Sequence, residues 1–262
     1  MKVGLASFAF RWAFKAGLTL EGFLQQAADF GAEVVQLCEN SGVERLGERE
    51  LKDLGDLARR LGIAVECGGT GGHRDQMEAG IRRTVSLGGR IYRSVLDSAG
   101  LTPEEAIAHV QALVPLLQDC GVTLCAENHF RFPPKTLGQM IATIDHPAVR
   151  ICLDPLNSIA RWSGPEETVR ELLPFARTAH IKDARIERAG NGWVISGAPL
   201  GEGSVDLAHY LAAIAPQVES LLLECWMDPV DGERGIRTLE QEADWARRGL
   251  AFIRTMTERN RA

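Results

Sequence analysis

The chain has 262 residues and a formal net charge of −6, with 29 Lys and Arg against 35 Asp and Glu. Its composition, 45% hydrophobic and 24% charged, is typical of a folded globular protein and excludes an intrinsically disordered one. The mild acidity argues against a dedicated nucleic-acid-binding protein, which needs a basic surface. No stretch approaches the ~20 consecutive apolar residues that cross a bilayer, so we expect no membrane partner.

The start of the chain resembles a signal peptide only superficially. Lys2 precedes an apolar run, but Arg11 and Lys15 interrupt that run and no small-residue cleavage site follows, so we interpret it as a first strand. Six cysteines include no Cys-x-x-Cys pair, and most lie within apolar runs. This pattern indicates reduced thiols in the core of a cytoplasmic protein.

Short apolar runs rich in β-branched residues alternate along the chain with longer stretches of helical periodicity. We expect buried strands at residues 3–8, 33–38, 63–67, 91–96, 122–127, 149–154, 178–182 and 220–226. We expect helices at residues 20–30, 48–61, 73–87, 102–121 and 239–253, with a further one opening at 164–167. Thr19 and Thr102 are predicted helix caps, and Pro115 is predicted to kink or divide its helix.

Eight strands alternating with eight helical segments predict parallel strands joined by right-handed crossovers. The strand count and the length fit an α/β fold, a (β/α)8 TIM barrel that forms a single domain over residues 1–262. A doubly wound sheet is the alternative. It is disfavoured because no Gly-x-Gly-x-x-Gly follows the first strand.

One connection, residues 183–205, is longer than the usual two to six residues after the seventh strand. A hairpin signal lies around residues 189–192, Ala-Gly-Asn-Gly. Long loops at the carboxyl end of a barrel build active-site walls, so we expect an extended loop or hairpin there beside the active site.

Each of the last four predicted strands ends in an ionisable residue: Glu127, Asp154, His180 and Glu224. Neighbouring strands lie about 4.8 Å apart, so four such side chains can converge at one face of a barrel. Carboxylates that meet repel one another unless a cation joins them. Oxygen ligands with one nitrogen suit Mn²⁺ best, with Mg²⁺, Co²⁺ or Zn²⁺ as alternatives. Separate salt bridges at a polar barrel rim are the competing interpretation.

Five segments occur in the order and at the spacing that are typical of one known superfamily: residues 126–129, 152–158, 180–183, 199–203 and 223–224. With them the sequence resembles the xylose isomerase-like barrel superfamily of sugar isomerases and epimerases, which also includes apurinic endonucleases and some sugar lyases. The resemblance implies that the four strand-end residues bind one catalytic divalent metal. It also implies that Glu127 and Glu224 act as an acid/base pair on opposite faces of the substrate.

A metal-held hydroxy-ketone can form a stabilised enediolate, from which several reactions proceed. We predict a metal-dependent sugar isomerase or epimerase acting on a small keto-sugar. The alternative is a lyase (a decarboxylase, dehydratase or β-eliminase) acting on a keto-sugar or keto-sugar acid. An apurinic endonuclease is disfavoured, because the chain lacks the Asp-x-His pair that supplies further zinc ligands after the seventh strand.

Residues near the strand ends are candidates for substrate contact. His129 stands two residues beyond Glu127, and Lys182 two beyond His180, so strand alternation should point each pair the same way. We therefore predict His129 as an acid/base and Lys182 as a partner for an oxyanion or carboxylate. A structural imidazole and a salt bridge to Asp183 or Glu202 are the alternatives.

The predicted substrate-binding residues are Asn157, Arg185, Trp226, Arg93 and Asn40. Asn157 stands where many members of the superfamily have a histidine. We expect the partner to be a small sugar molecule, and a homo-oligomer is compatible with the sequence.

Overall fold

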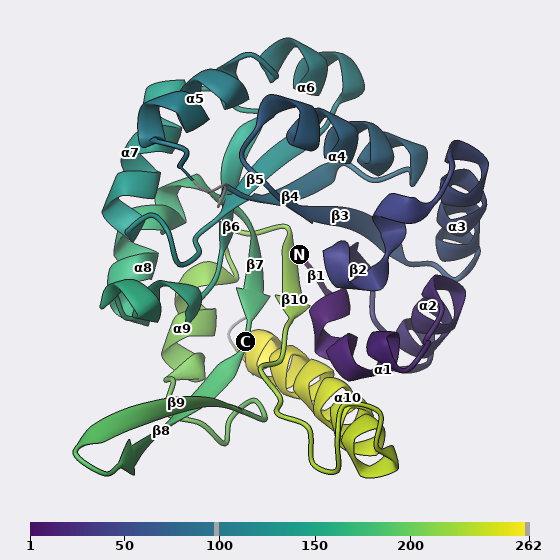
Figure 1. Ribbon diagram of the computed structural model, residues 1–262, viewed down its shortest axis with the longest axis vertical. Coiled ribbons are helices and arrows are strands. Elements are labelled where there is room, and N and C mark those ends of the chain that lie inside the picture. Colours follow the sequence, from purple (N-terminus) through teal and green to yellow (C-terminus); the bar gives the residue numbers. More distant parts are fainter. Residues whose placement is uncertain (97–99, 260–262) are drawn as a thin grey trace.

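A computed structural model describes residues 1–96 and 100–259 of the chain. Eight parallel strands close into a barrel in the order β1-β10-β7-β6-β5-β4-β3-β2, and helices surround it (Figure 1). The predicted single-domain TIM barrel is confirmed. Residues 97–99 and 260–262 of the predicted domain span lie outside the described residues.

All eight predicted barrel strands are present, most of them shorter than predicted. They are β1 (Lys2–Ala6), β2 (Val34–Leu37), β3 (Ala64–Thr70), β4 (Ile91–Val95), β5 (Thr123–Glu127), β6 (Val149–Leu153), β7 (Ala176–Ile181) and β10 (Ser220–Leu223). The first strand ends at Ala6 because Ser7–Phe10 forms a 3-10 turn (η1). Strands β4 and β10 are buried along their whole length, as expected when helices cover one face and the barrel interior the other.

The helices on the described part of the chain include all of the predicted ones. They are α1 (Arg11–Lys15), α2 (Leu20–Asp29), α3 (Glu48–Arg60), α4 (Arg74–Ser86), α5 (Pro103–Gln111), α6 (Val114–Cys120), α7 (Pro134–Ile144), α8 (Pro165–Leu172), α9 (Leu207–Ile214) and α10 (Ile236–Arg259). Thr19 caps α2 by accepting from Gly22 N, and Thr102 caps α5 by accepting from Glu105 N. The helix expected over 102–121 is divided into α5 and α6 before Pro115.

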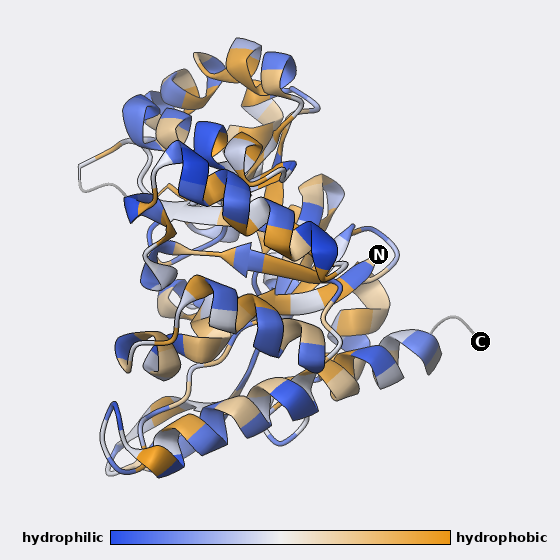
Figure 2. Cartoon of the chain, turned by 90° about the vertical axis from the view of Figure 1, so that its right-hand side faces the viewer, coloured by the Kyte–Doolittle hydropathy of each residue, from blue (hydrophilic) through white to orange (hydrophobic). Residues whose placement is uncertain are grey.

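Helices α1, α7 and α9 had no predicted range, and α10 extends beyond the predicted 239–253 at both ends. Figure 2 shows both apolar and polar residues on the outer helices that face the viewer, the pattern of helices that pack one face on a core. Among the described residues, no helix combines the length and the apolar character needed to cross a membrane. All six cysteines are free, and Cys38, Cys67, Cys125 and Cys152 are buried; the cytoplasmic location stays a prediction.

The long connection forms the predicted hairpin, β8 (Asp183–Ala189) and β9 (Gly192–Ala198), paired antiparallel. Gly190 turns the chain with φ +59°, a conformation that favours glycine. The tip of the hairpin projects away from the barrel (Figure 1). Its base is held by the buried carboxylate of Asp183, which accepts from the backbone N–H groups of residues 184, 201, 203 and 205 at 2.8–3.3 Å.

Replacing Asp183 by asparagine should therefore loosen this loop. An amide presents N–H donors to two of the four backbone donors, so about two charge-assisted hydrogen bonds are lost. We expect Asp183→Asn to lower the free energy of unfolding by about 3 kcal/mol in urea denaturation. Glu187→Gln, on the exposed part of the same strand, is the control and should change it by less than about 0.5 kcal/mol. An unchanged denaturation midpoint for Asp183→Asn would contradict the role of this carboxylate.

Candidate metal centre

The structure brings the four predicted strand-end residues together. Glu127 ends β5, Asp154 follows β6, His180 lies on β7 and Glu224 follows β10, and these strands are consecutive neighbours in the barrel. One ligand atom from each residue lies within 4.8 Å of the others, and all four side chains are buried. The predicted convergence is confirmed, and the cluster can hold a metal ion.

The imidazole of His180 turns one nitrogen toward all three carboxylates. Its Nδ1 lies 3.1 Å from Glu127 Oε1, 3.5 Å from Glu224 Oε1 and 3.6 Å from Asp154 Oδ2. Burial by itself would lower the pKa of His180, but the negative groups around the ring raise that pKa well above its usual value. Because Nδ1 is the nitrogen closest to all three carboxylates, it is the His180 atom that faces the candidate metal position.

Lys182 places an ammonium group inside the same cluster. Its Nζ lies 2.8 Å from Asp154 Oδ2 and also forms an ion pair with Glu224, and its side chain is only 1% exposed. Burial opposes the charge on each of these groups, but the ion pairs prevail: the pKa of Lys182 is raised and that of Asp154 is lowered, while the pKa of Glu224 falls to about 2. The alternative salt bridges of Lys182 to Asp183 or Glu202 are not what the structure shows.

Asp154 offers a direct test of whether these residues fit a cation. Its Oδ1 accepts from the backbone N–H groups of Leu156 and Asn157, both at 2.8 Å. Its Oδ2 is buried and lies 2.8 Å from the Lys182 ammonium, with which it forms an ion pair, and 3.6 Å from His180 Nδ1. Three buried carboxylates meet one ammonium and one imidazole here, and a divalent ion bound by these oxygen and nitrogen atoms would offset the excess negative charge. The residues present therefore fit such an ion.

Two of the predicted substrate-binding residues lie within the cluster and contact its members. Asn157 Nδ2 donates to Glu127 Oε1 at 2.8 Å, and Asn157 Oδ1 accepts from Lys182 Nζ at 3.3 Å. Arg93 is 1% exposed, and its Nε lies 3.2 Å from Glu127 Oε2. Arg93 and Asn157 thus orient Glu127, whether or not they also touch a substrate.

Trp226 lies against the cluster on another side. The Lys182 ammonium is 5.0 Å from the centre of its ring, within the range of a cation–π contact. Strand β9 approaches Trp226 so closely that a Cβ on Gly197 would lie 1.8 Å from the Trp226 carbonyl oxygen. The base of the hairpin is therefore adjacent to the residues that surround Lys182, although the role of 183–205 as an active-site wall stays a prediction.

The other predicted site residues are engaged elsewhere. Asn40 exchanges two hydrogen bonds with Ser7, at 2.6 and 2.9 Å. Arg185 lies exposed on β8 and pairs with Glu202 at 3.5 Å. His129 comes after the end of β5, where strand alternation no longer applies, and its ring packs on Phe130 with a centroid distance of 3.9 Å. Substrate roles for Asn40, Arg185 and His129 stay predictions.

Sequence reasoning missed a polar group in the barrel interior. Gln36 on β2 contacts His180 Nε2 at 2.9 Å through its Oε1, and it donates to the buried Glu66 on β3 at 3.0 Å. Both residues stand within the predicted strands 33–38 and 63–67, whose other residues are mostly apolar. The available signal was a polar residue inside each run, since a polar side chain buried in a barrel needs a partner.

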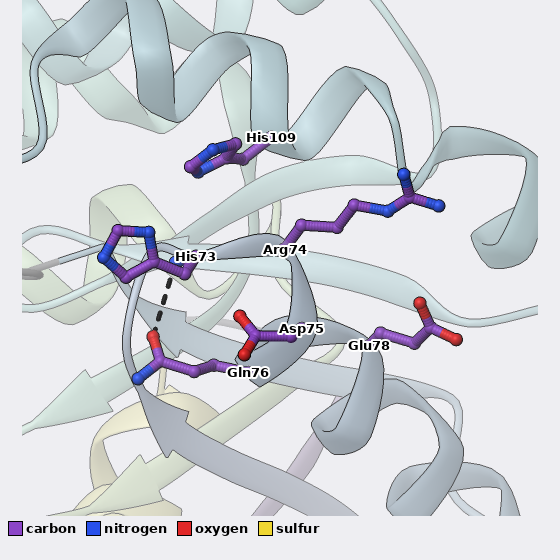
Figure 3. A pocket seen from close by; sticks show the side chains of 6 residues that line it. All are labelled: His73, Arg74, Asp75, Gln76, Glu78 and His109. Atoms are coloured by element: carbon purple, nitrogen blue, oxygen red, sulfur yellow. Dashed lines mark hydrogen bonds between the residues drawn. The ribbon is translucent and has the colours of Figure 1, made fainter.

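A separate hollow of about 510 Å³ lies beside the start of α4 (Figure 3). It is lined by His73, Arg74, Asp75, Gln76, Glu78 and His109. Two of its lining side chains contact the backbone nearby: Gln76 Oε1 accepts from His73 N at 3.4 Å, and His109 Nδ1 lies 3.0 Å from Gly72 O. No residue of the acidic cluster lines this hollow, so we place the candidate site at the cluster.

Comparisons with known proteins agree with this geometry. A family model described as xylose isomerase-like TIM barrel matches residues 24–256. The chain belongs to the xylose isomerase-like TIM barrel family. A curated relative, the 3-oxo-isoapionate decarboxylase of Pectobacterium atrosepticum, is 30% identical over 267 residues, which cover 97% of this chain and 96% of the relative.

Solved structures share the fold. The D-psicose 3-epimerase of Clostridium cellulolyticum H10, solved with D-tagatose, has a TM-score of 0.73 at 15% identity, covering 98% of this chain and 99% of that chain. A xylose isomerase-like TIM barrel protein from Mycobacterium smegmatis, solved in complex with magnesium, has a TM-score of 0.70 at 15% identity, covering 96% and 97%. At these identities the likeness shows the fold alone, and it agrees with the family match.

Proposed function

We propose that this protein is a divalent-metal-dependent lyase that releases CO₂ from a 3-oxo sugar acid. The observation behind this choice is the buried ammonium of Lys182, 2.8 Å from Asp154 Oδ2 and paired with Glu224 inside the acidic cluster. Once a bound cation neutralises those carboxylates, this ammonium is free to meet an anionic substrate. The curated relative, whose name states the decarboxylation of a 3-oxo acid, supports the same choice over nearly the whole chain.

We assign the metal ion to Glu127, Asp154, His180 and Glu224. Three carboxylates and one imidazole favour Mn²⁺, with Mg²⁺, Co²⁺ and Zn²⁺ as alternatives. When bound, the ion supplies Lewis acidity that stabilises negative charge on a substrate carbonyl oxygen. Arg93 and Asn157 hold Glu127 in place, and Gln36 holds the far side of His180.

The reaction balances as a simple bond cleavage. In a 3-oxo acid the bond from carbon 2 to the carboxyl carbon breaks, and its electron pair moves toward the 3-oxo group, where the oxygen gains negative charge. CO₂ leaves, and a proton is then delivered to carbon 2 to give the ketone. Lys182 holds the carboxylate or the developing oxyanion, Trp226 limits the access of water to that ammonium, and His129 is the candidate proton donor.

An isomerase or epimerase, the first choice from the sequence, is the second candidate. Glu127 and Glu224 both reach the same point of the cluster, 3.1 and 3.5 Å from His180 Nδ1, so two carboxylates are available for proton transfer at one substrate carbon. In either case the expected partner is a small sugar molecule, and a homo-oligomer stays a prediction.

One assay separates the two candidates. Protein loaded with Mn²⁺ is incubated in D₂O with 3-oxo sugar acids and, separately, with free ketoses, while CO₂ and the proton NMR spectrum are followed. We expect one CO₂ per acid consumed, deuterium at carbon 2 of the product and no change in the ketoses. Spontaneous loss of CO₂ is measured without protein and with Asp154→Asn. A stereoisomer formed from a free ketose, with no CO₂ above these controls, would overturn the lyase in favour of the epimerase.

A further inference from the structure

A chain of hydrogen bonds crosses the barrel interior behind the candidate metal centre. It starts at His180 Nε2, which lies 2.9 Å from Gln36 Oε1, and continues from Gln36 Nε2 to Glu66 Oε2 at 3.0 Å. Ser220 donates to the other oxygen of Glu66, and Thr178 lies 2.7 Å from Ser220 between hydroxyl oxygens. These five side chains are at most 4% exposed, so their polar atoms depend on one another rather than on solvent.

The orientation of the Gln36 amide follows from its two outer neighbours. Arg93 Nε lies 3.4 Å from Gln36 Oε1, and a guanidinium can only donate, so the amide atom on that side must be the oxygen. On the other side, Glu66 Oε2 accepts a hydrogen from the amide nitrogen. A flipped amide would set its NH₂ against the Arg93 donor and its oxygen against Glu66 Oε2, and both contacts would become unfavourable.

The fixed amide determines which nitrogen of His180 carries a proton. Gln36 Oε1 can only accept, so the His180 Nε2 facing it must donate an N–H. In a neutral imidazole the second nitrogen is then without a proton. That second nitrogen, Nδ1, is the atom that faces Glu127, Glu224 and Asp154 at 3.1–3.6 Å.

We propose that Gln36, oriented by Arg93 and Glu66, is a positioning residue that keeps the His180 proton on Nε2 and thereby reserves Nδ1 as the metal ligand. The inference rests on the metal centre of the proposed function but not on the reaction. It gives a role to Gln36 and to the buried Glu66, which the proposed chemistry does not use directly. A carboxylate or amide that holds the far nitrogen of a metal-binding histidine is a general device for setting ring orientation and ligand basicity.

The first test is the ring NMR spectrum of protein labelled with ¹⁵N histidine and loaded with Zn²⁺, which is diamagnetic. In the wild type we expect His180 to show a proton directly bonded to Nε2 and a metal-shifted Nδ1. A proton on Nδ1 with the metal on Nε2, or no Zn²⁺ bound at all, would overturn the proposal. Because no substrate is present, this result is independent of whether the protein releases CO₂.

Two variants separate positioning from packing. Gln36→Met keeps a similar volume but removes the acceptor, and we expect a 10–100-fold weaker Zn²⁺ Kd by calorimetry and a second Zn²⁺-bound population in which Nδ1 of His180 carries the proton. The exchange Gln36→Glu with Glu66→Gln keeps the total charge and restores an acceptor opposite His180 Nε2 and Arg93. We expect this double variant to keep the Nε2 proton and a Kd within about threefold of the wild type.

Two results with these variants would contradict the role of Gln36. Circular dichroism and the urea midpoint show whether each variant is folded, and the wild-type spectrum stands even where a variant fails to fold. If Gln36→Met keeps the wild-type tautomer and affinity, Gln36 does not position His180. If the exchange variant is folded but as weak as Gln36→Met, the acceptor is not what matters, and the proposal is wrong.

Discussion

Asp154→Asn is expected to lose the metal ion and, with it, essentially all activity. Its Oδ2 is a buried anionic oxygen that faces His180 Nδ1 and the Lys182 ammonium, and an amide there would replace an anionic ligand by a neutral group. Loss of a direct ligand should exceed the 10–100-fold effect typical of residues that only orient one, so we expect the Mn²⁺ Kd to rise by more than about 100-fold. Calorimetry and elemental analysis of the purified protein measure this directly.

Glu202→Gln is the matched control for that experiment. Glu202 is an exposed carboxylate that pairs with Arg185 and Arg248 outside the cluster, so its loss should leave metal affinity within about twofold. If Asp154→Asn binds Mn²⁺ as the wild type does, or if chelation leaves the wild type fully active, the metal centre is misassigned.

Lys182→Met is expected to separate metal binding from catalysis. Without the ammonium, Asp154 and Glu224 no longer share their charge with a fixed cation, so Mn²⁺ should bind at least as tightly as in the wild type. The rate of CO₂ release should nevertheless fall by about 10²–10⁴-fold, because the substrate anion loses its partner. Measuring the Mn²⁺ Kd and kcat in parallel shows whether kcat falls while the metal affinity is kept.

Lys182→Met should also change the free energy of unfolding of the protein. Removing one partner from a buried ion pair leaves uncompensated carboxylates, which costs about 3–5 kcal/mol in the metal-free protein. Saturating Mn²⁺ should restore most of this loss, since a ligand that binds only the folded state stabilises it. A Lys182→Met protein that releases CO₂ at the wild-type rate would contradict the assigned role of Lys182, whatever its stability.

Much of the fold and the centre of the site follow from local sequence signals. Continuous apolar runs identified the barrel strands because those strands are buried on both faces, and a charged residue at the end of four successive runs located Glu127, Asp154, His180 and Glu224. Thr19 and Thr102 marked helix starts because a hydroxyl there satisfies a free backbone N–H. These are properties that each segment shows by itself.

The contacts of the site that the sequence did not predict depend on segments that are far apart in the chain. Lys182 meets Asp154 and Glu224 rather than its neighbour Asp183, and only the closed barrel brings those three strand ends together. Gln36 and Glu66 looked like isolated polar residues within apolar strands until the barrel paired them. Asn40 stood at a strand end as a substrate contact would, yet Ser7 uses both ends of its amide.

The most direct test of the central claim is anomalous diffraction at the manganese edge from crystals grown with Mn²⁺. Our account predicts one strong peak within about 2.0–2.6 Å of carboxylate oxygens from Glu127, Asp154 and Glu224 and of Nδ1 of His180. A peak bonded to His180 through Nε2 would contradict the proposed role of Gln36 alone. A peak elsewhere on the protein, such as between His73 and His109, or no peak in catalytically active crystals, would contradict the metal centre itself.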